Sequence, residues 1–158
     1  MHPLVVHCKR SEYDIYIGRG RDPRSNDKYG SIWGNPFTHL HESSAPVKVE
    51  SRDLAVQLHR TWLLTGWKIE SLPYSDQVKL SSLESRRRAV IYRLPELRGK
   101  RLGCWCAPQS CHGNNLVEFA SLDIEQNSDE WYLFFNIPCD LNREPEPEIK
   151  VTLEDLFK

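Results

Sequence analysis

Short apolar segments with the spacing of strands open the chain. Residues 4–8 form a β-branched run, and residues 13–17 alternate apolar and polar side chains, which predicts a strand over each segment. We expect Ser11-Glu12 to form a tight connection between them. Residues 100–106, which end in a mostly apolar stretch, predict a third and buried strand. The chain therefore holds the strands of a small sheet.

Apolar residues at helical spacing predict three helices elsewhere in the chain. Ser51 is suited to cap a helix that continues until Gly66 ends it. A second helix is predicted over residues 82–94, with the triplet Arg86-Arg87-Arg88 largely on its outer face. A third is predicted over residues 114–122.

This mixed order of strands and helices predicts an α/β fold, with a single small Rossmann-like sheet flanked by helices and a C-terminal extension. We divide the chain into an α/β core over residues 1–122 and an acidic extension over residues 123–158. Within the extension, residues 131–137 predict an aromatic strand and residues 143–148 a proline-punctuated linker. Residues 151–157 predict a short helix that either docks on the core or frays.

The length and composition exclude several classes of protein. A chain of 158 residues fits one domain. No segment approaches the roughly 18 consecutive apolar residues of a membrane span, and the first nine residues lack the pattern of a secretory signal. We therefore expect a cytoplasmic protein with no membrane partner. The composition indicates no oligomeric state.

The formal net charge of −1 hides an uneven distribution of charge. Residues 1–122 carry 18 basic and 12 acidic side chains, whereas residues 123–158 carry 3 basic and 10 acidic ones. A basic core of this kind attracts phosphate or nucleic acid, for which the acidic extension would compete. A solvated surface with an unrelated tail gives the same pattern, so the charge alone leaves both interpretations open.

Three of the five cysteines fall within eight residues, which is not the spacing of a disulfide framework. Cys104, Cys106, Cys111 and His112 form a Cys3His set, a recognised zinc ligand set, if the loop between them folds back over the strand end. Alternatively, Cys111 is a thiolate activated at a helix start and acts as a nucleophile or an anion contact. In a third interpretation the cysteines are small buried apolar residues and His112 caps the helix.

Two further cysteines lie outside this cluster. Cys8, together with His7, would join the site if the first strand lay beside the strand over residues 100–106. We interpret Cys139, in the extension, as unrelated to the site.

A long glycine- and arginine-rich segment, residues 18–34, follows the second predicted strand. It matches neither a dinucleotide fingerprint nor a P-loop, because the fixed spacings of both are absent. Either it is a solvated surface loop, or its basic residues bind phosphate and the aromatic ring and amide at its end hold a base. The residues concerned are Arg19, Arg21, Arg24 and Lys28 for the phosphate, and Trp33 and Asn35 for the base.

Five segments carry motifs that occur together: Val5-Val6-His7-Cys8-Lys9-Arg10, Ile17-Gly18-Arg19-Gly20, Trp33-Gly34-Asn35-Pro36-Phe37, Cys104-Trp105-Cys106-Ala107-Pro108 and Cys111-His112-Gly113. On these the chain resembles the DUF4326 family of bacteria and phages, for which no activity is established, over roughly residues 4–122. Where family members often carry Asp after Cys-His-Gly, this chain has Asn114, which argues against a role that needs a carboxylate there. A fainter similarity to DUF488 proteins implies a Rossmann-like sheet whose strand ends form the site.

Two classes of function follow from these residues. In the first, the protein associates with a nucleotide or a nucleic acid and is either an enzyme or a binding protein: Arg19 and Arg21 hold phosphate, and Trp33 and Asn35 hold a base. Cys111 and His112 would then lie at the reacting centre, with His112 as general acid or base. In the second, the protein is a non-catalytic interaction module stabilised by zinc on the Cys3His set. Neither class names a substrate.

Overall fold

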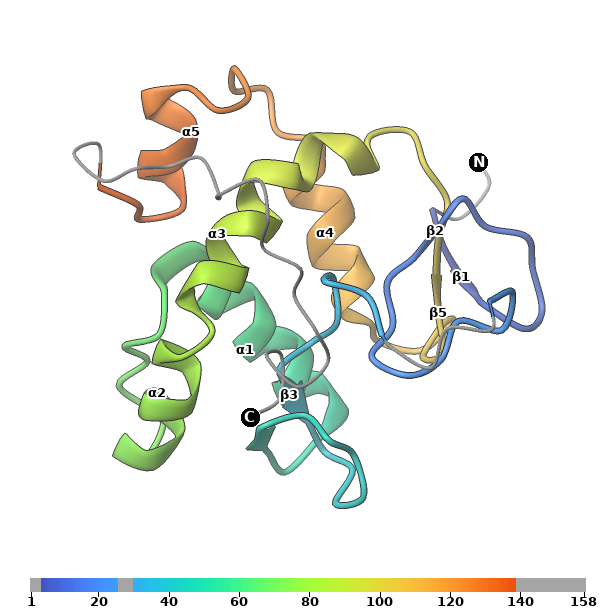
Figure 1. Cartoon of the computed structure of the whole chain (residues 1–158), viewed down its shortest axis with the longest axis horizontal. Helices are drawn as coiled ribbons and strands as arrows, with labels where there is room; N and C mark the ends of the chain where they lie inside the picture. Colours follow the sequence, from blue (N-terminus) through green and yellow to red (C-terminus); the bar gives the residue numbers. More distant parts are fainter. Residues whose placement is uncertain (1–3, 26–29, 139–158) are drawn as a thin grey trace.

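The computed structural model of the chain describes residues 4–25 and 30–138. Three short strands, β1 (Val5–His7), β2 (Ile15–Tyr16) and β5 (Leu102–Cys104), form a parallel sheet in the order β1-β5-β2. The sheet lies at one end of the molecule, and the helices gather beside it (Figure 1). This arrangement confirms the predicted α/β class with a small sheet and flanking helices.

The connection between the first two strands is longer than the tight connection predicted at Ser11-Glu12. Because β5 lies between β1 and β2 and pairs in parallel with both, the chain must cross β5 before it enters β2. At this crossing the ring of Tyr13 lies over Gly103. A Cβ atom added to Gly103 would lie 2.5 Å from that ring. Gly103 therefore leaves the space that the crossing occupies.

Replacing Gly103 by alanine is expected to lower the free energy of unfolding by about 1–3 kcal/mol, because the added methyl group must displace the buried Tyr13 ring. Gly20→Ala is the matched control, since the nearest atoms to its added Cβ are 3.9 Å away. Urea unfolding of both variants measures the difference. Equal stability of the two variants would show that the crossing does not depend on Gly103.

A second, two-stranded sheet, β3 (Phe37–Thr38) paired in parallel with β4 (Val47–Lys48), was not predicted. It precedes α1 (Arg52–Thr65), whose predicted boundaries are confirmed. The side chain of Ser51 accepts a hydrogen bond from the Leu54 N–H at 3.1 Å, and Gly66 ends the helix with a φ of +94°.

The helix observed within residues 82–94 is shorter than predicted, and a further helical element precedes and follows it along the chain. The chain forms α2 (Tyr74–Ser81), which was not predicted, then α3 (Glu84–Arg93) and a 3₁₀ turn, η1 (Leu94–Leu97). Pro95 lies in this turn, as expected of a residue that cannot continue an α-helix.

The prediction that arginines 86–88 lie largely on the outer face of this helix is wrong for two of them. Arg86 and Arg87 are buried, with 3% and 1% of their surface exposed. Arg86 donates hydrogen bonds to the backbone carbonyls of Ile32, at 3.0 Å, and Gly34. Burial of a guanidinium is tolerated here because carbonyl oxygens from distant segments accept its hydrogen bonds.

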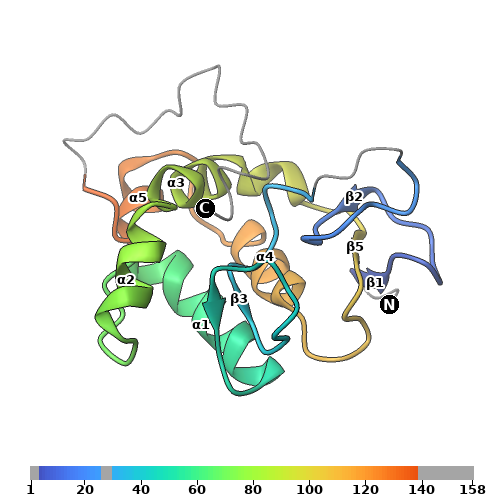
Figure 2. The ribbon, with the colours of Figure 1, turned by 60° about the horizontal axis from the view of Figure 1, so that its bottom comes forward.

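Two helices follow the sheet. In the predicted position lies α4 (His112–Ala120), which starts two residues earlier than expected. It contacts β1, α1 and η1, and both views place it between the sheet and the other helices (Figures 1 and 2). The start of α4 is thereby held against the edge of the sheet where its strands end.

The predicted aromatic strand over residues 131–137 is wrong, because this segment contains α5 (Asp129–Phe134). Ser128 caps the helix by accepting a hydrogen bond from the Trp131 N–H at 3.1 Å. Trp131 and Phe135, four residues apart, pack into the main core. A short aromatic run fits either element by pattern alone, and here the cap and the four-residue spacing decide for a helix.

The described part of the predicted extension, residues 123–138, packs through α5 into the same core as the rest of the chain. The predicted linker over residues 143–148, the predicted terminal helix over residues 151–157 and Cys139 lie outside the described residues. In the part of the chain that is described, no helix has both the length and the apolar content to cross a membrane.

Candidate functional site

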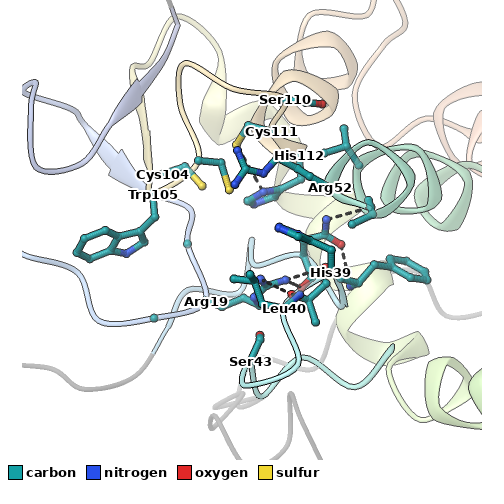
Figure 3. Close-up of a pocket in the computed structure, with 18 of the residues that line it drawn as sticks. Arg19, His39, Leu40, Ser43, Arg52, Cys104, Trp105, Ser110, Cys111 and His112 are labelled. Carbon is teal, nitrogen blue, oxygen red and sulfur yellow. Dashed lines mark hydrogen bonds between the residues drawn. The ribbon is translucent and has the colours of Figure 1, made fainter. Parts of the chain in front are cut away.

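A pocket of about 400 Å³ opens where the strand ends meet two helix starts (Figure 3). One wall comes from the residues that follow β2 and β5, and another from the first turns of α1 and α4. Ligands of open α/β sheets bind at this edge, outside the carboxyl ends of the strands. The lining residues are Gly18, Arg19, Gly20, Asn35, Phe37, Thr38, His39, Leu40, Ser43, Ser44, Arg52, Ala55, Val56, Cys104, Trp105, Cys106, Ser110, Cys111 and His112.

Three side chains of the predicted metal set converge in this pocket. Cys104 is the last residue of β5, Cys111 is the N-cap of α4 and His112 is its first residue. Their ligand atoms all lie within 4.8 Å of one another, and all three residues are buried. The group could hold a metal ion, as the predicted zinc site requires.

The hydrogen bonds of His112 fix which ring nitrogen carries the proton. Its Nε2 lies 2.9 Å from the carbonyl oxygen of Ile17, which only accepts, so Nε2 is the donor. Nδ1 is therefore unprotonated in the neutral ring and faces the sulfur of Cys111 at 3.7 Å. Burial lowers the pKa of His112 to about 4, so the ring is neutral at physiological pH.

Cys106, the fourth member of the predicted set, lies half-buried beside this group of three. Hydrogen bonds from the thiols of Cys104 and Cys111 lower the pKa of Cys106. For Cys111, the hydrogen bond to Cys104 and then that to Cys106 raise the pKa. The three thiols therefore hydrogen-bond with one another in a metal-free cluster.

Two arginines bring positive charge to the pocket. Arg19 is held in place, since its guanidinium donates hydrogen bonds to the carbonyl oxygens of Asn35 at 2.8 Å and Phe37 at 2.7 Å. Arg52, the first residue of α1, extends toward the cysteine and histidine side chains (Figure 3). Its buried Nε has no hydrogen-bond partner among the described residues. Arg52 therefore offers a donor to an acceptor that enters the pocket.

The structure brings together six of the eight residues predicted for the site. Those that line the pocket are Arg19, Asn35, Cys104, Cys106, Cys111 and His112. The side-chain amide of Asn35 is already engaged in two hydrogen bonds. Its nitrogen donates to the carbonyl oxygen of Ala55 at 3.1 Å, and its oxygen accepts from the Phe37 N–H at 2.9 Å.

Arg21 and Trp33 lie away from this pocket. Arg21 donates a hydrogen bond to the carbonyl oxygen of Ser25 on an exposed loop. Trp33 is buried in the core, and the guanidinium of Arg93 lies over its ring. Of the other predicted loop cations, Arg24 stacks on the ring of Tyr13, with its Cζ 3.7 Å from the ring centre. Lys28 lies outside the described residues.

Neither His7 nor Cys8, which we considered for the cluster, is among the described residues that line the pocket. The first strand does lie beside β5, with His7 opposite Cys104. Cys8, however, packs with Val6, Tyr13 and Tyr16 in a separate small core cluster.

Sequence reasoning missed Arg52 and the exposed ring of Trp105, both of which line the pocket. A signal for Arg52 was present, since it directly follows the cap Ser51 and so must lie at a helix start. Trp105 donates a hydrogen bond from its indole nitrogen to the hydroxyl of Tyr16 at 2.7 Å. The contribution of the loop that includes His39 and Ser43 had no signal, because it depends on the unpredicted β3–β4 sheet.

Comparison with known proteins gives one match. A family model described as "Domain of unknown function (DUF4326)" matches residues 6–122. Neither the curated proteins nor the solved structures yield a match to the chain. The matched region runs from β1 past the end of α4 and contains every residue that lines the pocket.

Proposed function

The chain belongs to the DUF4326 family, and we propose that the pocket in its family region binds a mononucleotide by its phosphate. One observation carries this proposal: the pocket is lined by Arg19 and Arg52, whereas no carboxylate is among its described lining residues. A pocket lined by two cations and no acidic group favours an anion. The Arg52 Nε, which is buried without a hydrogen-bond partner among the described residues, supports the same assignment.

The two helix starts add to this preference for an anion. The first residues of α1 and α4, Arg52 and His112, both line the pocket. The first N–H groups of a helix lack intrahelical partners, and the helix dipole places partial positive charge there. Phosphate groups bind at such positions.

The size and the rim of the pocket suit the rest of a nucleotide. Its volume of about 400 Å³ lies within the range of small-molecule sites. Trp105 is 40% exposed and lines the pocket, so its ring is available to stack on a base. In this proposal Trp105 takes the role that sequence reasoning gave to Trp33, which is buried.

We place the reacting end of the bound nucleotide at Cys111 and His112. Both line the pocket, and the unprotonated Nδ1 of His112 is able to accept a proton or bind a metal ion. A second candidate function, a zinc-stabilised interaction module without catalysis, is favoured by one observation: Cys104, Cys111 and His112 are all buried. The two candidates differ in whether a small molecule binds.

Isothermal titration calorimetry tests the proposal with nucleoside mono-, di- and triphosphates, the matching nucleosides, inorganic phosphate and a single-stranded oligonucleotide. We expect nucleotides to bind and Arg52→Gln to weaken their binding at least about tenfold, since hydrogen bonds to charged groups contribute about 1.5–3 kcal/mol. Arg60→Gln is the matched control. Arg60 lies on the same helix, pairs with Glu118 and does not line the pocket.

Four outcomes would contradict the proposal. Nucleosides that bind as tightly as nucleotides would remove the role of the phosphate. An equal loss in the Arg60 variant would show that general charge, not the pocket, attracts the ligand. Binding of the oligonucleotide alone would assign the pocket to nucleic acid, and binding of nothing would favour the interaction module.

A further inference from the structure

The ligand atoms of Cys104, Cys111 and His112 are already close to the spacing of a tetrahedral metal site. Zinc bonds of about 2.0–2.3 Å place tetrahedral ligand atoms roughly 3.5 Å apart. The sulfur of Cys111 and Nδ1 of His112 are 3.7 Å apart, and all three ligand atoms lie within 4.8 Å of one another. Shifts of about 1 Å or less would therefore complete the geometry.

The surroundings of these atoms are those of metal ligands. A ligating histidine commonly donates its other ring N–H to a backbone carbonyl, as His112 does to Ile17 at 2.9 Å. The Gly113 N–H points at the sulfur of Cys111 at 3.4 Å, which favours a thiolate there. The fold thus orients an imidazole lone pair and a sulfur toward the same point.

The donor set selects the metal. Two thiolates and an imidazole suit zinc, whereas magnesium and calcium require oxygen ligands. No carboxylate is among the described residues that line the pocket. A Cys2His set with a fourth position left to water or substrate is a known arrangement of catalytic zinc.

From these contacts we infer that Cys104, Cys111 and His112 bind a zinc ion whose fourth position opens into the pocket. Cys106 lies beside the group but outside the three atoms that converge. Zinc with two thiolates and a neutral imidazole carries no net charge, so the nearby Arg52 guanidinium does not oppose it. The inference goes beyond nucleotide binding and does not depend on it, since every ligand comes from the chain.

The test uses the full chain and the metal alone. The protein is purified in a reducing buffer, stripped with a chelator and titrated with Co²⁺, which absorbs visible light strongly when it is tetrahedral and bound by thiolates. We expect one equivalent to bind and Zn²⁺ to displace it. The bands should disappear in Cys104→Ser, Cys111→Ser and His112→Gln, and persist in Cys106→Ser. The matched control is Cys8→Ser, a buried cysteine outside the cluster, which should also keep the bands.

A second measurement serves if a ligand variant fails to fold. Alkylation of the unmodified chain with and without Zn²⁺, mapped by mass spectrometry, should show that the metal protects Cys104 and Cys111 and leaves Cys106 reactive. A folded chain that binds no Co²⁺ or Zn²⁺ would overturn the inference. Loss of the bands in the Cys106 variant, together with protection of Cys106 by the metal, would show that Cys106 is the fourth ligand. That result would overturn the open fourth position of the zinc ion. Because no nucleotide is present, neither result depends on the proposed function.

Discussion

Replacement of Arg87 by methionine is expected to lower the free energy of unfolding by about 3–5 kcal/mol, the range for removing one partner of a buried charged network. Arg87 is 1% exposed. Its guanidinium donates hydrogen bonds to the carbonyl oxygens of Trp62 at 2.8 Å, Leu63 at 3.0 Å and Phe135. It also pairs with Glu84, 2.8 Å away.

These contacts explain the size of the effect. Trp62 and Leu63 lie in the last turn of α1, where the Trp62 carbonyl also accepts a hydrogen bond from the Gly66 N–H at 2.9 Å, and Phe135 follows α5. One side chain on α3 therefore joins the ends of two other helices. Methionine would fill much of the space, but the carbonyl oxygens would remain buried with fewer donors, at a cost of about 1–3 kcal/mol for each group left unsatisfied.

Urea unfolding measures this difference, with Arg88→Met as the control. Arg88 is the next residue on α3, its side chain is 26% exposed and it contacts Glu84 at 3.3 Å. Its replacement should cost less than about 1 kcal/mol, as for other ion pairs that are accessible to solvent. A similar loss of stability in both variants would show that the pairing with Glu84, rather than the buried carbonyl network, accounts for the effect of Arg87.

Those parts of the fold that depend on short stretches of sequence were predictable. The helix from Ser51 to Gly66 was predicted because its cap, its apolar spacing and its terminating glycine are local signals. The α/β class followed in the same way from the order of patterns. The convergence of Cys104, Cys111 and His112 was also accessible, since these residues lie within nine positions on a strand, a loop and a helix start.

Features that depend on distant segments were not predictable. The arginine triplet has the composition of a solvated face, and only the carbonyl groups of remote segments such as Ile32 make the burial of Arg86 favourable. The same limit applies to the pocket. Trp105 and Arg52 line it because the end of β5 packs near the start of α1, some fifty positions away, and no local pattern encodes that approach.

The buried histidine pair, His59 and His112, is expected to make the metal-free protein unstable in acid. Their ring centres are 5.2 Å apart. Burial, followed by the repulsion that a protonated His112 ring would exert, lowers the pKa of His59 well below its usual value of 6.5, and burial lowers that of His112 to about 4. Both rings are neutral in the folded chain, whereas an unfolded chain takes up their protons below pH 6.5. Stability should therefore fall from pH 6.5 to about 4, with His112 alone contributing about 3 kcal/mol.

Urea unfolding at several pH values between 7 and 4.5, with a chelator present, measures this slope. In His59→Phe one proton-binding group of the unfolded chain is gone, so stability should decline less steeply below pH 6.5. The variant also removes the acceptor for the Asn115 side chain, 3.1 Å from His59 Nδ1, which lowers stability equally at every pH and leaves the slope to report the proton. His41→Phe, the replacement of a histidine at an exposed position, is the matched control. An unchanged slope in the His59 variant would mean that the His59 ring takes up its proton in the folded chain as readily as in the unfolded chain, and would overturn the prediction for His59.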